Sequence, residues 1–169
     1  MNAQIEYMFI CEFCEITKDL LCEEHVKSMK EYHHHGKIDT HFHSVYVAYS
    51  VFKLCKIYDI SDTRDITRAA LVHDFYLYDW HITKHSEMHA WYHPKAAYQN
   101  VNAYLFEPTP MQKDMILHHM FPLCKPPKSI GGIILTVCDK YCAGRELTGS
   151  FGKFIPIYNT INERCEKFD

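Results

Sequence analysis

Several polar residues interrupt apolar helical segments of this chain, and their types suit metal chemistry. His43 heads an apolar stripe, and the pair His73-Asp74 ends the largely apolar run 68–72. His119 ends another amphipathic segment, and Asp139 follows the apolar run 133–138. Burying a carboxylate costs free energy unless it is paired or binds a cation. Because helical bundles build metal sites from histidines and carboxylates on inward helix faces, these residues predict such a site.

Taken singly, each residue has a simpler interpretation. A lone histidine on an apolar stripe is usually a hydrogen-bonded core residue, and Asp139 alone could form an ion pair with Lys140 or Arg145. The order along the chain favours the metal site. The succession His43, then His73-Asp74, then Asp139 resembles the H…HD…D signature of the HD-domain superfamily of metal-dependent phosphohydrolases.

The sequence around these residues also resembles the motifs of that family. Residues 40–48 resemble the first motif, in which a ligand histidine is followed by a helix, and residues 69–74 resemble the apolar approach to the HD pair. Residues 135–139 resemble the closing aspartate motif. The likeness covers roughly residues 35–145, which is most of the chain.

Two further motifs resemble those of the HD branches that bind two metal ions. His93-Pro94 resembles an inserted His-Pro motif, and the pair His118-His119 resembles a second inserted histidine. In those branches the HD aspartate bridges the two ions, which implies that role for Asp74. The resemblance therefore implies these metal ligands: His43, His73, Asp74, His93, His119 and Asp139.

Two of these assignments have a competitor beside them. His41 competes with His43, and His118 competes with His119. The apolar stripes favour His43 and His119, because each is in phase with the buried face of its segment.

The ligand types and the resemblance together suggest a reaction. A shell of histidines and carboxylates suits Fe, Mn, Co, Ni or Zn better than Mg or Ca, and the family resemblance favours two ions of Fe. The resemblance implies a hydrolase that attacks a phosphomonoester, phosphodiester or phosphoanhydride with a metal-bound hydroxide oriented by Asp74. His89 and Lys140 are the candidates for steadying the phosphate groups.

The substrate is less defined by the sequence. Met120-Phe121-Pro122 stands where the cyclic-dinucleotide phosphodiesterase branch has Gly-Tyr-Pro, which speaks against such substrates. The closer likeness is to small stand-alone bacterial HD proteins, including the branch that hydrolyses diadenosine tetraphosphate. We therefore expect a small phosphorylated substrate, a nucleotide or dinucleotide. The alternatives are a diiron oxygenase acting on a polyol or phosphonate, and a non-catalytic nucleotide-binding sensor.

Composition limits the partners and the location. The chain has 169 residues, a net charge of −3 and a pI near 6.5, so neither duplex nucleic acid nor an anionic membrane is an expected partner. No apolar run approaches the roughly 18 residues that a membrane helix needs. The N-terminus lacks the features of a secretory signal, so a cytoplasmic location is expected. The oligomeric state is left open.

Helical periodicity predicts an all-α, single-domain HD-type bundle of about six or seven helices over residues 1–169. An N-terminal helix within 1–35 is expected to pack on an HD core of roughly 36–145, followed by a C-terminal helix over 151–167. Helix starts are expected at Asp39, at Pro94 and at Thr109, whose spacing to Gln112 fits a capping box. No strand is expected.

A second set of potential metal ligands lies near the N-terminus. Cys11-x-x-Cys14 and Cys22-x-x-His25 mimic a zinc pattern, but only seven residues separate the two pairs. We expect ordinary core or boundary residues here and leave zinc binding open. The run His33-His34-His35 is expected to be exposed at a helix end, where a cation is favourable.

Overall fold

Side-chain caps define the starts of three helices that carry the core. Asp39 Oδ1 accepts a hydrogen bond from Phe42 N at 2.7 Å and begins α3 (Thr40–Ile57). Thr109 and Gln112 form the expected capping box at the start of α6 (Pro110–His118). Ser129 Oγ accepts from Gly132 N at 3.1 Å and begins α7 (Ile130–Leu147). Each cap satisfies backbone N–H groups that would otherwise have no partner.

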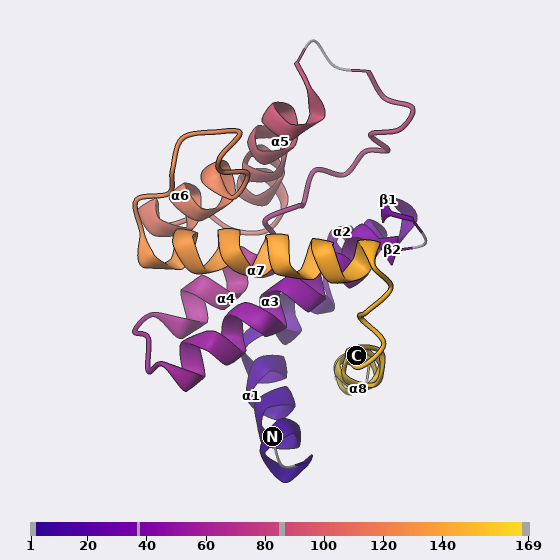
Figure 1. Ribbon diagram of the computed structural model, residues 1–169, viewed down its shortest axis with the longest axis vertical. Helices are drawn as coiled ribbons and strands as arrows, with labels where there is room; N and C mark the ends of the chain where they lie inside the picture. Colours follow the sequence, from indigo (N-terminus) through magenta and orange to yellow (C-terminus); the bar gives the residue numbers. More distant parts are fainter. Residues whose placement is uncertain (1–2, 37, 85–86, 167–169) are drawn as a thin grey trace.

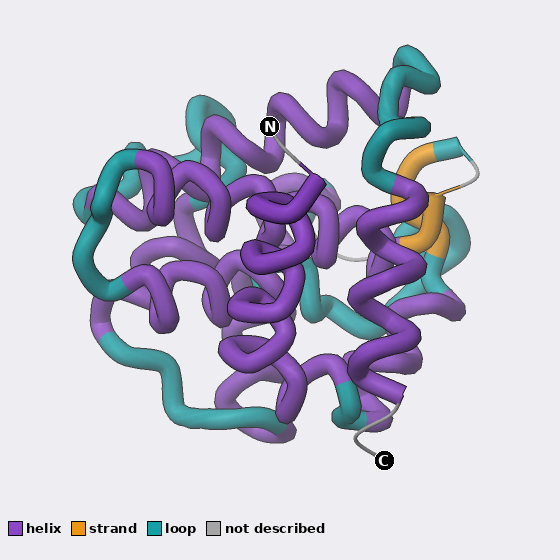
Figure 2. Tube along the Cα trace, turned by 90° about the horizontal axis from the view of Figure 1, so that it is seen from below, coloured by secondary structure: helices purple, strands orange, loops and turns teal. Residues whose placement is uncertain are grey.

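The structure, a computed structural model, describes residues 3–36, 38–84 and 87–166. Almost all regular structure within these ranges is helical, which confirms the all-α, single-domain expectation (Figure 2). The remaining α-helices in the described ranges are α1 (Ala3–Leu21), α2 (Glu24–Lys27), α4 (Thr63–Leu71), α5 (His89–Tyr104) and α8 (Ile155–Glu166). No helix in this part of the chain has both the length and the apolar character needed to cross a membrane.

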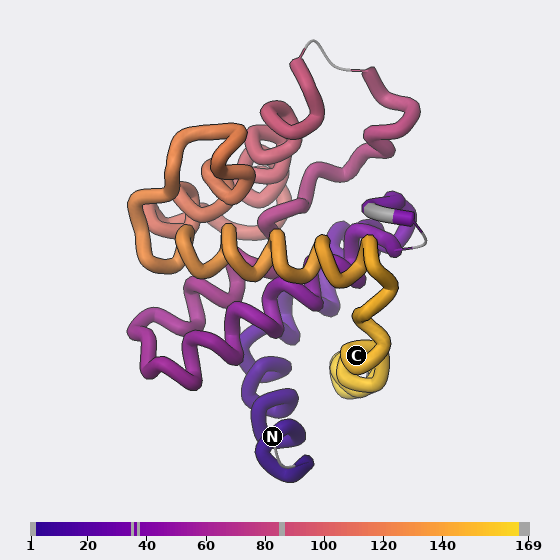
Figure 3. Tube along the Cα trace, in the orientation of Figure 1, coloured from indigo at the N-terminus to yellow at the C-terminus, as the bar shows by residue number. Residues whose placement is uncertain are grey.

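Helix α7 runs across the front of the molecule in the view of Figure 1. It packs against α3 on one side and α6 on the other, and α3 in turn packs against α4 (Figure 1). The segments 40–57 and 130–147 are far apart in sequence and adjacent in space. Helices α1 and α8, from opposite ends of the chain, contact each other away from α5 and α6 (Figure 3). Helix α5 packs against α6, so α3 to α7 form one connected group of packed helices.

A glycine permits the close approach of α7 to its neighbours. A Cβ atom on Gly131 would lie 2.9 Å from Met115 Sδ and 3.0 Å from Ile66 Cγ1. Met115 and Ile66 are fully buried side chains of α6 and α4. The absence of a side chain at Gly131 therefore lets three helices meet.

The N-terminal segment departs from the single helix expected within residues 1–35. Helix α1 ends at Leu21 and is followed by α2, a short 3₁₀ helix η1 (Ser28–Glu31) and an antiparallel hairpin of β1 (His33–His35) and β2 (Ile38–Asp39). Gly36 has φ +59° within this hairpin. That left-handed conformation, which glycine adopts readily, reverses the chain.

Two other helix boundaries differ from expectation. Helix α5 begins at His89, one turn before Pro94, so Pro94 lies inside the helix and His93 is not its N-cap. The extra turn is held by the N–H groups of Trp91 and Tyr92, which donate to Met88 O at 2.9 and 3.0 Å. The last helix begins at Ile155, four residues after the start that was expected at residue 151.

Candidate metal centre

Six side chains from five helices meet in the core. His43 comes from α3, His73-Asp74 from the turn that follows α4, and Asp139 from α7. His93 comes from α5 and His119 from the C-terminal end of α6. All six residues are buried, with at most 8% of each exposed. The structure thus brings together every residue that the sequence predicts as a metal ligand.

Asp74 lies at the centre of this cluster, and its two carboxylate oxygens face different histidines. Oδ1 lies 3.2 Å from His93 Nε2 and 3.5 Å from His119 Nε2. Oδ2 lies 3.6 Å from His73 Nε2 and 3.9 Å from His43 Nε2. Asp74 is therefore shared by two adjacent groups of nitrogen donors.

The outer ring nitrogens of three of these histidines donate to backbone carbonyls. The bonds are His73 Nδ1 to Ala70 O at 2.8 Å, His93 Nδ1 to His89 O at 2.9 Å and His119 Nδ1 to Ile116 O at 2.7 Å. A neutral imidazole that donates through Nδ1 has a lone pair on Nε2. Each Nε2 is therefore oriented inward as an acceptor, which is the arrangement that metal-binding histidines use.

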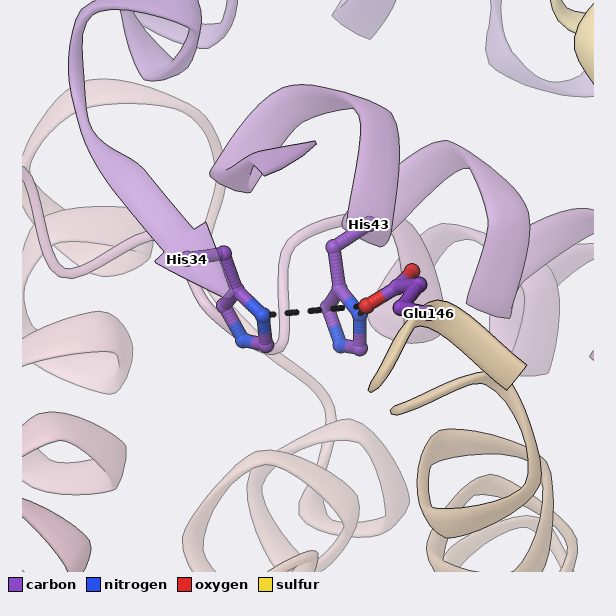
Figure 4. A group of neighbouring side chains, drawn as sticks. All are labelled: His34, His43 and Glu146. Atoms are coloured by element: carbon purple, nitrogen blue, oxygen red, sulfur yellow. Dashed lines mark hydrogen bonds and ion pairs between the residues drawn. The ribbon is translucent and has the colours of Figure 1, made fainter. Parts of the chain in front are cut away.

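His43 is held by carboxylates at both ends of its ring. Its Nδ1 lies 2.9 Å from Glu146 Oε2, and its Nε2 lies 3.2 Å from Asp139 Oδ1 (Figure 4 draws the Glu146 side). Burial alone would lower the pKa of His43, but the bonds to Asp139 and Glu146 outweigh it and raise the pKa to about 10. Without a bound cation His43 is protonated at neutral pH, and a metal ion would replace that proton.

Sequence reasoning missed Glu146, although a signal was present. Glu146 follows Asp139 by seven residues on α7, a spacing that places both on one helix face. Its side chain is fully buried, whereas Arg145 beside it is half-buried. The polar pair Arg145-Glu146 has the sequence of a solvated helix end, so the burial of the Glu146 carboxylate was not predicted.

The close contact between His93 and His119 indicates that the cluster suits a cation. Their Nε2 atoms lie 2.8 Å apart, and both rings already donate through Nδ1. Two lone pairs would therefore face each other unless a proton or a metal ion lies between or beside them. Burial lowers the pKa of His119, so protonation of that ring is disfavoured.

Buried atoms without hydrogen-bond partners also indicate that the cluster suits a cation. Among the described residues, His73 Nε2 and Asp74 Oδ1 are buried and form no hydrogen bond. Such atoms are rare in folded proteins and call for an ion or another ligand. The nitrogen and carboxylate donors present fit a transition-metal ion.

The structure corrects the expectation for His34. Its side chain is only 11% exposed, and its Nε2 lies 3.0 Å from Asp74 Oδ2. The expectation of an exposed helix-end histidine was wrong because residues 33–35 form a strand, which directs His34 toward the cluster. No sequence signal separates His34 from the exposed His33 beside it.

The cluster opens into a pocket of about 240 Å³. Trp80 and His89 stack at its wall with ring centroids 4.9 Å apart, and Tyr78 Oη lies 3.1 Å from His89 Nδ1. Lys140 Nζ donates to His119 O at 3.0 Å and lies 3.8 Å from Asp139 Oδ2. The pocket is lined by His34, Asp74, Trp80, His89, His93, His119, Met120, Asp139, Lys140 and Ala143.

The competing histidines lie outside the cluster. His41 Nδ1 lies 2.9 Å from Tyr158 Oη, and burial lowers the pKa of His41 to about 3. His118 Nδ1 lies 2.9 Å from Asp114 Oδ1, and His118 lines a different pocket from the one that Asp74 lines. The structure therefore places His43 and His119, not their neighbours, beside Asp74.

The N-terminal Cys/His pattern forms no comparable site. Across residues 3–36, 38–84 and 87–166, each group of potential ligands close enough to hold a metal belongs to the cluster around His43 and Asp74. Cys14 is buried in the core, and His25 lies 3.1 Å from Glu23 and stacks on Tyr104. These residues behave as the core and boundary residues that were expected.

No protein-family model matches this chain, and no curated protein or solved structure matches it either. Nothing in these comparisons identifies an HD-domain family, so the resemblance to HD domains stays a prediction from the sequence motifs.

Proposed function

We propose that this protein is a metal-dependent phosphohydrolase of the HD type with a dinuclear centre. The observation that carries the proposal is the position of Asp74, whose Oδ1 faces His93 and His119 while its Oδ2 faces His43 and His73. A carboxylate shared in this way is suited to bridging two ions.

The donors divide into two sets. His43, His73, Asp139 and Asp74 Oδ2 would hold one ion, and His93, His119 and Asp74 Oδ1 would hold the other. Iron is the first candidate, with Mn, Co, Ni and Zn compatible with the same donors. Bound ions of this kind screen the charge of phosphate oxygens and lower the pKa of coordinated water.

Charge balance also favours bound cations. Asp74, Asp139 and Glu146 are three buried carboxylates within one cluster. Interactions with His73, His93 and the other histidines keep the pKa of Asp74 well below its usual value despite burial, so Asp74 is ionised. Buried negative charge is stable only when it is paired, and divalent cations would pair it.

The pocket supplies groups suited to a phosphorylated substrate. His93 and His119 line it, whereas His43 and His73 do not, so a substrate would approach from the His93 side. The Lys140 ammonium at the rim can neutralise a phosphate oxygen, and His89 can donate to one. The stacked rings of Trp80 and His89 form a flat wall that suits a nucleobase. A pocket of about 240 Å³ favours a small substrate such as a nucleotide.

The proposal is tested by phosphate-ester hydrolysis. Protein loaded with Mn²⁺ or Fe²⁺ would be assayed with p-nitrophenyl phosphate, bis(p-nitrophenyl) phosphate and a panel of mono- and dinucleotides. We expect hydrolysis that EDTA abolishes and added metal restores. Asp74→Asn should lower kcat/KM by at least about a hundredfold. Mutating a residue that only hydrogen-bonds to a metal ligand already costs up to about 100-fold, and loss of a bridging ligand should cost more. Asp79→Asn, a matched change in a carboxylate that does not line the pocket, should leave the rate near the wild-type value.

Two results would contradict the proposal. A metal-loaded protein that hydrolyses none of these esters but consumes oxygen with a polyol or phosphonate would be an oxygenase. A protein that binds nucleotides tightly without turnover in any metal would be a sensor.

A further inference from the structure

One imidazole near the cluster belongs to none of the motifs. We propose that His34, carried by the β1–β2 hairpin, is an additional metal ligand on the Asp74 Oδ2 side. This inference rests on the proposed metal centre, and it adds a ligand from outside the five helices. Strand β1 contacts both α3 and α7, the helices that carry His43 and Asp139.

The first argument is convergence on one oxygen atom. His34 Nε2 lies 3.0 Å from Asp74 Oδ2, which also faces His73 Nε2 at 3.6 Å and His43 Nε2 at 3.9 Å. Three imidazole nitrogens from three separate elements thus surround the same carboxylate oxygen. Of the three, the nitrogen of His34 is the nearest.

The second argument is that His34 repeats the orientation of His43. The two rings stack with centroids 3.8 Å apart and an interplanar angle of 15° (Figure 4). Each directs Nδ1 toward Glu146 Oε2, at 2.9 Å for His43 and 3.9 Å for His34, and Nε2 toward the aspartates. Glu146 Oε2 thus lies beside the outer nitrogen of each ring, which is where a ligand histidine usually has a carboxylate. The two ring planes are nearly parallel, so His34 would have to turn out of the stack for both Nε2 atoms to reach one ion.

A ligand at His34 would make the two halves of the centre unequal. The Oδ2 side would have four protein residues besides Asp74: His34, His43, His73 and Asp139. The Oδ1 side would have only His93 and His119, which line the pocket together with His34 and Asp139 of the Oδ2 side. Metal sites closed by protein donors are structural, whereas sites with open positions bind substrate. The hairpin would thereby leave the ion on the Oδ1 side as the one with open positions for substrate.

The experiment uses Co²⁺ as the probe, because its unpaired electrons shift the proton resonances of coordinated imidazoles. The number of shifted, exchangeable ring N–H resonances would be compared in wild type, His34→Phe and His34→Ala. Phenylalanine keeps an aromatic ring against His43 but has no nitrogen, so it separates ligation from packing. His33→Ala is the matched control, since His33 is an exposed histidine in the same strand.

We expect both His34 variants to lose one shifted ring N–H resonance that His33→Ala retains. Their Co²⁺ affinity, measured by competition with a chelator, should fall by about tenfold or more. An unchanged number of resonances in His34→Phe would overturn the proposal whatever the affinity, since His34 would then only hydrogen-bond to Asp74. A wild-type protein that binds no Co²⁺ would also overturn it. Hydrolytic activity is not measured in this experiment. A protein with the expected Co²⁺ spectrum but no hydrolytic activity would therefore contradict the proposed function and leave the ligand role of His34 intact.

Discussion

At the scale of single residues, the partner of each outer ring nitrogen determines what the inner nitrogen can do. Backbone carbonyls accept from Nδ1 of His73, His93 and His119, whereas His43 has a carboxylate, Glu146, in that position. A carboxylate raises the basicity of the imidazole more than a carbonyl does. His43 is therefore expected to be the strongest nitrogen donor of the four.

Glu146→Gln tests this role directly. The amide oxygen can still accept from His43 Nδ1, but the negative charge is lost, so the affinity for Co²⁺ or Zn²⁺ should fall by about 10- to 100-fold. Competition with a chromophoric chelator measures that change. Glu163→Gln, an exposed substitution on α8, is the control and should leave affinity unchanged. Equal affinities in the two variants would mean that Glu146 does not support a ligand.

At the scale of elements, the centre depends on how α6 and α7 are joined, because these helices carry His119 and Asp139. Asp114 Oδ2 accepts hydrogen bonds from Lys128 N at 2.9 Å, Ser129 N at 2.9 Å and Ser129 Oγ at 2.8 Å. One carboxylate on α6 thus fixes the turn that starts α7.

Asp114→Asn should destabilise the fold in a pH-dependent way. Burial raises the pKa of Asp114, but the bonds from Ser129 and Lys128 outweigh it, so the folded-state pKa lies below the ordinary 3.8. The carboxylate therefore stabilises the fold above pH ~4, and this contribution is lost as the pH falls through the folded-state pKa. Urea unfolding at pH 7 should show a loss of ~1–3 kcal/mol that shrinks near pH 3. A loss of the same size at both pH values would contradict the role of the charge.

Gly131→Ala tests the close contact of α4, α6 and α7. The added methyl group would meet Met115 and Ile66, so the free energy of unfolding should fall by ~1–3 kcal/mol. Gly144→Ala is a matched control on the same helix, where a Cβ would meet nothing within 4 Å. That control should gain up to about 1 kcal/mol through helix propensity. Equal effects of the two changes, measured by chemical denaturation, would contradict the packing.

The sequence predicted the elements that have strong local signals. Asp39 and Thr109 were identified as helix caps because side-chain capping needs only residues within one turn. The hairpin was not predicted, because strands of three and two residues show no periodicity. For the same reason His34 could not be placed, since its contact with Asp74 depends on a long-range arrangement that no local pattern encodes.

At the scale of the whole molecule, the cluster joins helices from distant parts of the chain. Helices α3 to α7 each contribute at least one residue to it, directly or at the helix end. The resemblance to HD motifs predicted that six of these residues meet, but it did not predict that Glu146 and His34 join them. The sequence did not predict the side from which a substrate would approach. That side depends on the pocket, which is formed in part by residues between α4 and α5 and by α7. A bound ion would therefore stabilise the fold as well as the site.

Metal content per chain is the most direct test of a centre bridged by Asp74. Wild type, Asp74→Asn and the control Asp79→Asn would be reconstituted with Fe²⁺ or Mn²⁺, desalted and measured by elemental analysis. We expect about two equivalents in wild type and in the control, and a loss of at least one in Asp74→Asn. Wild-type protein without metal after reconstitution, or Asp74→Asn with the same two equivalents, would contradict the centre.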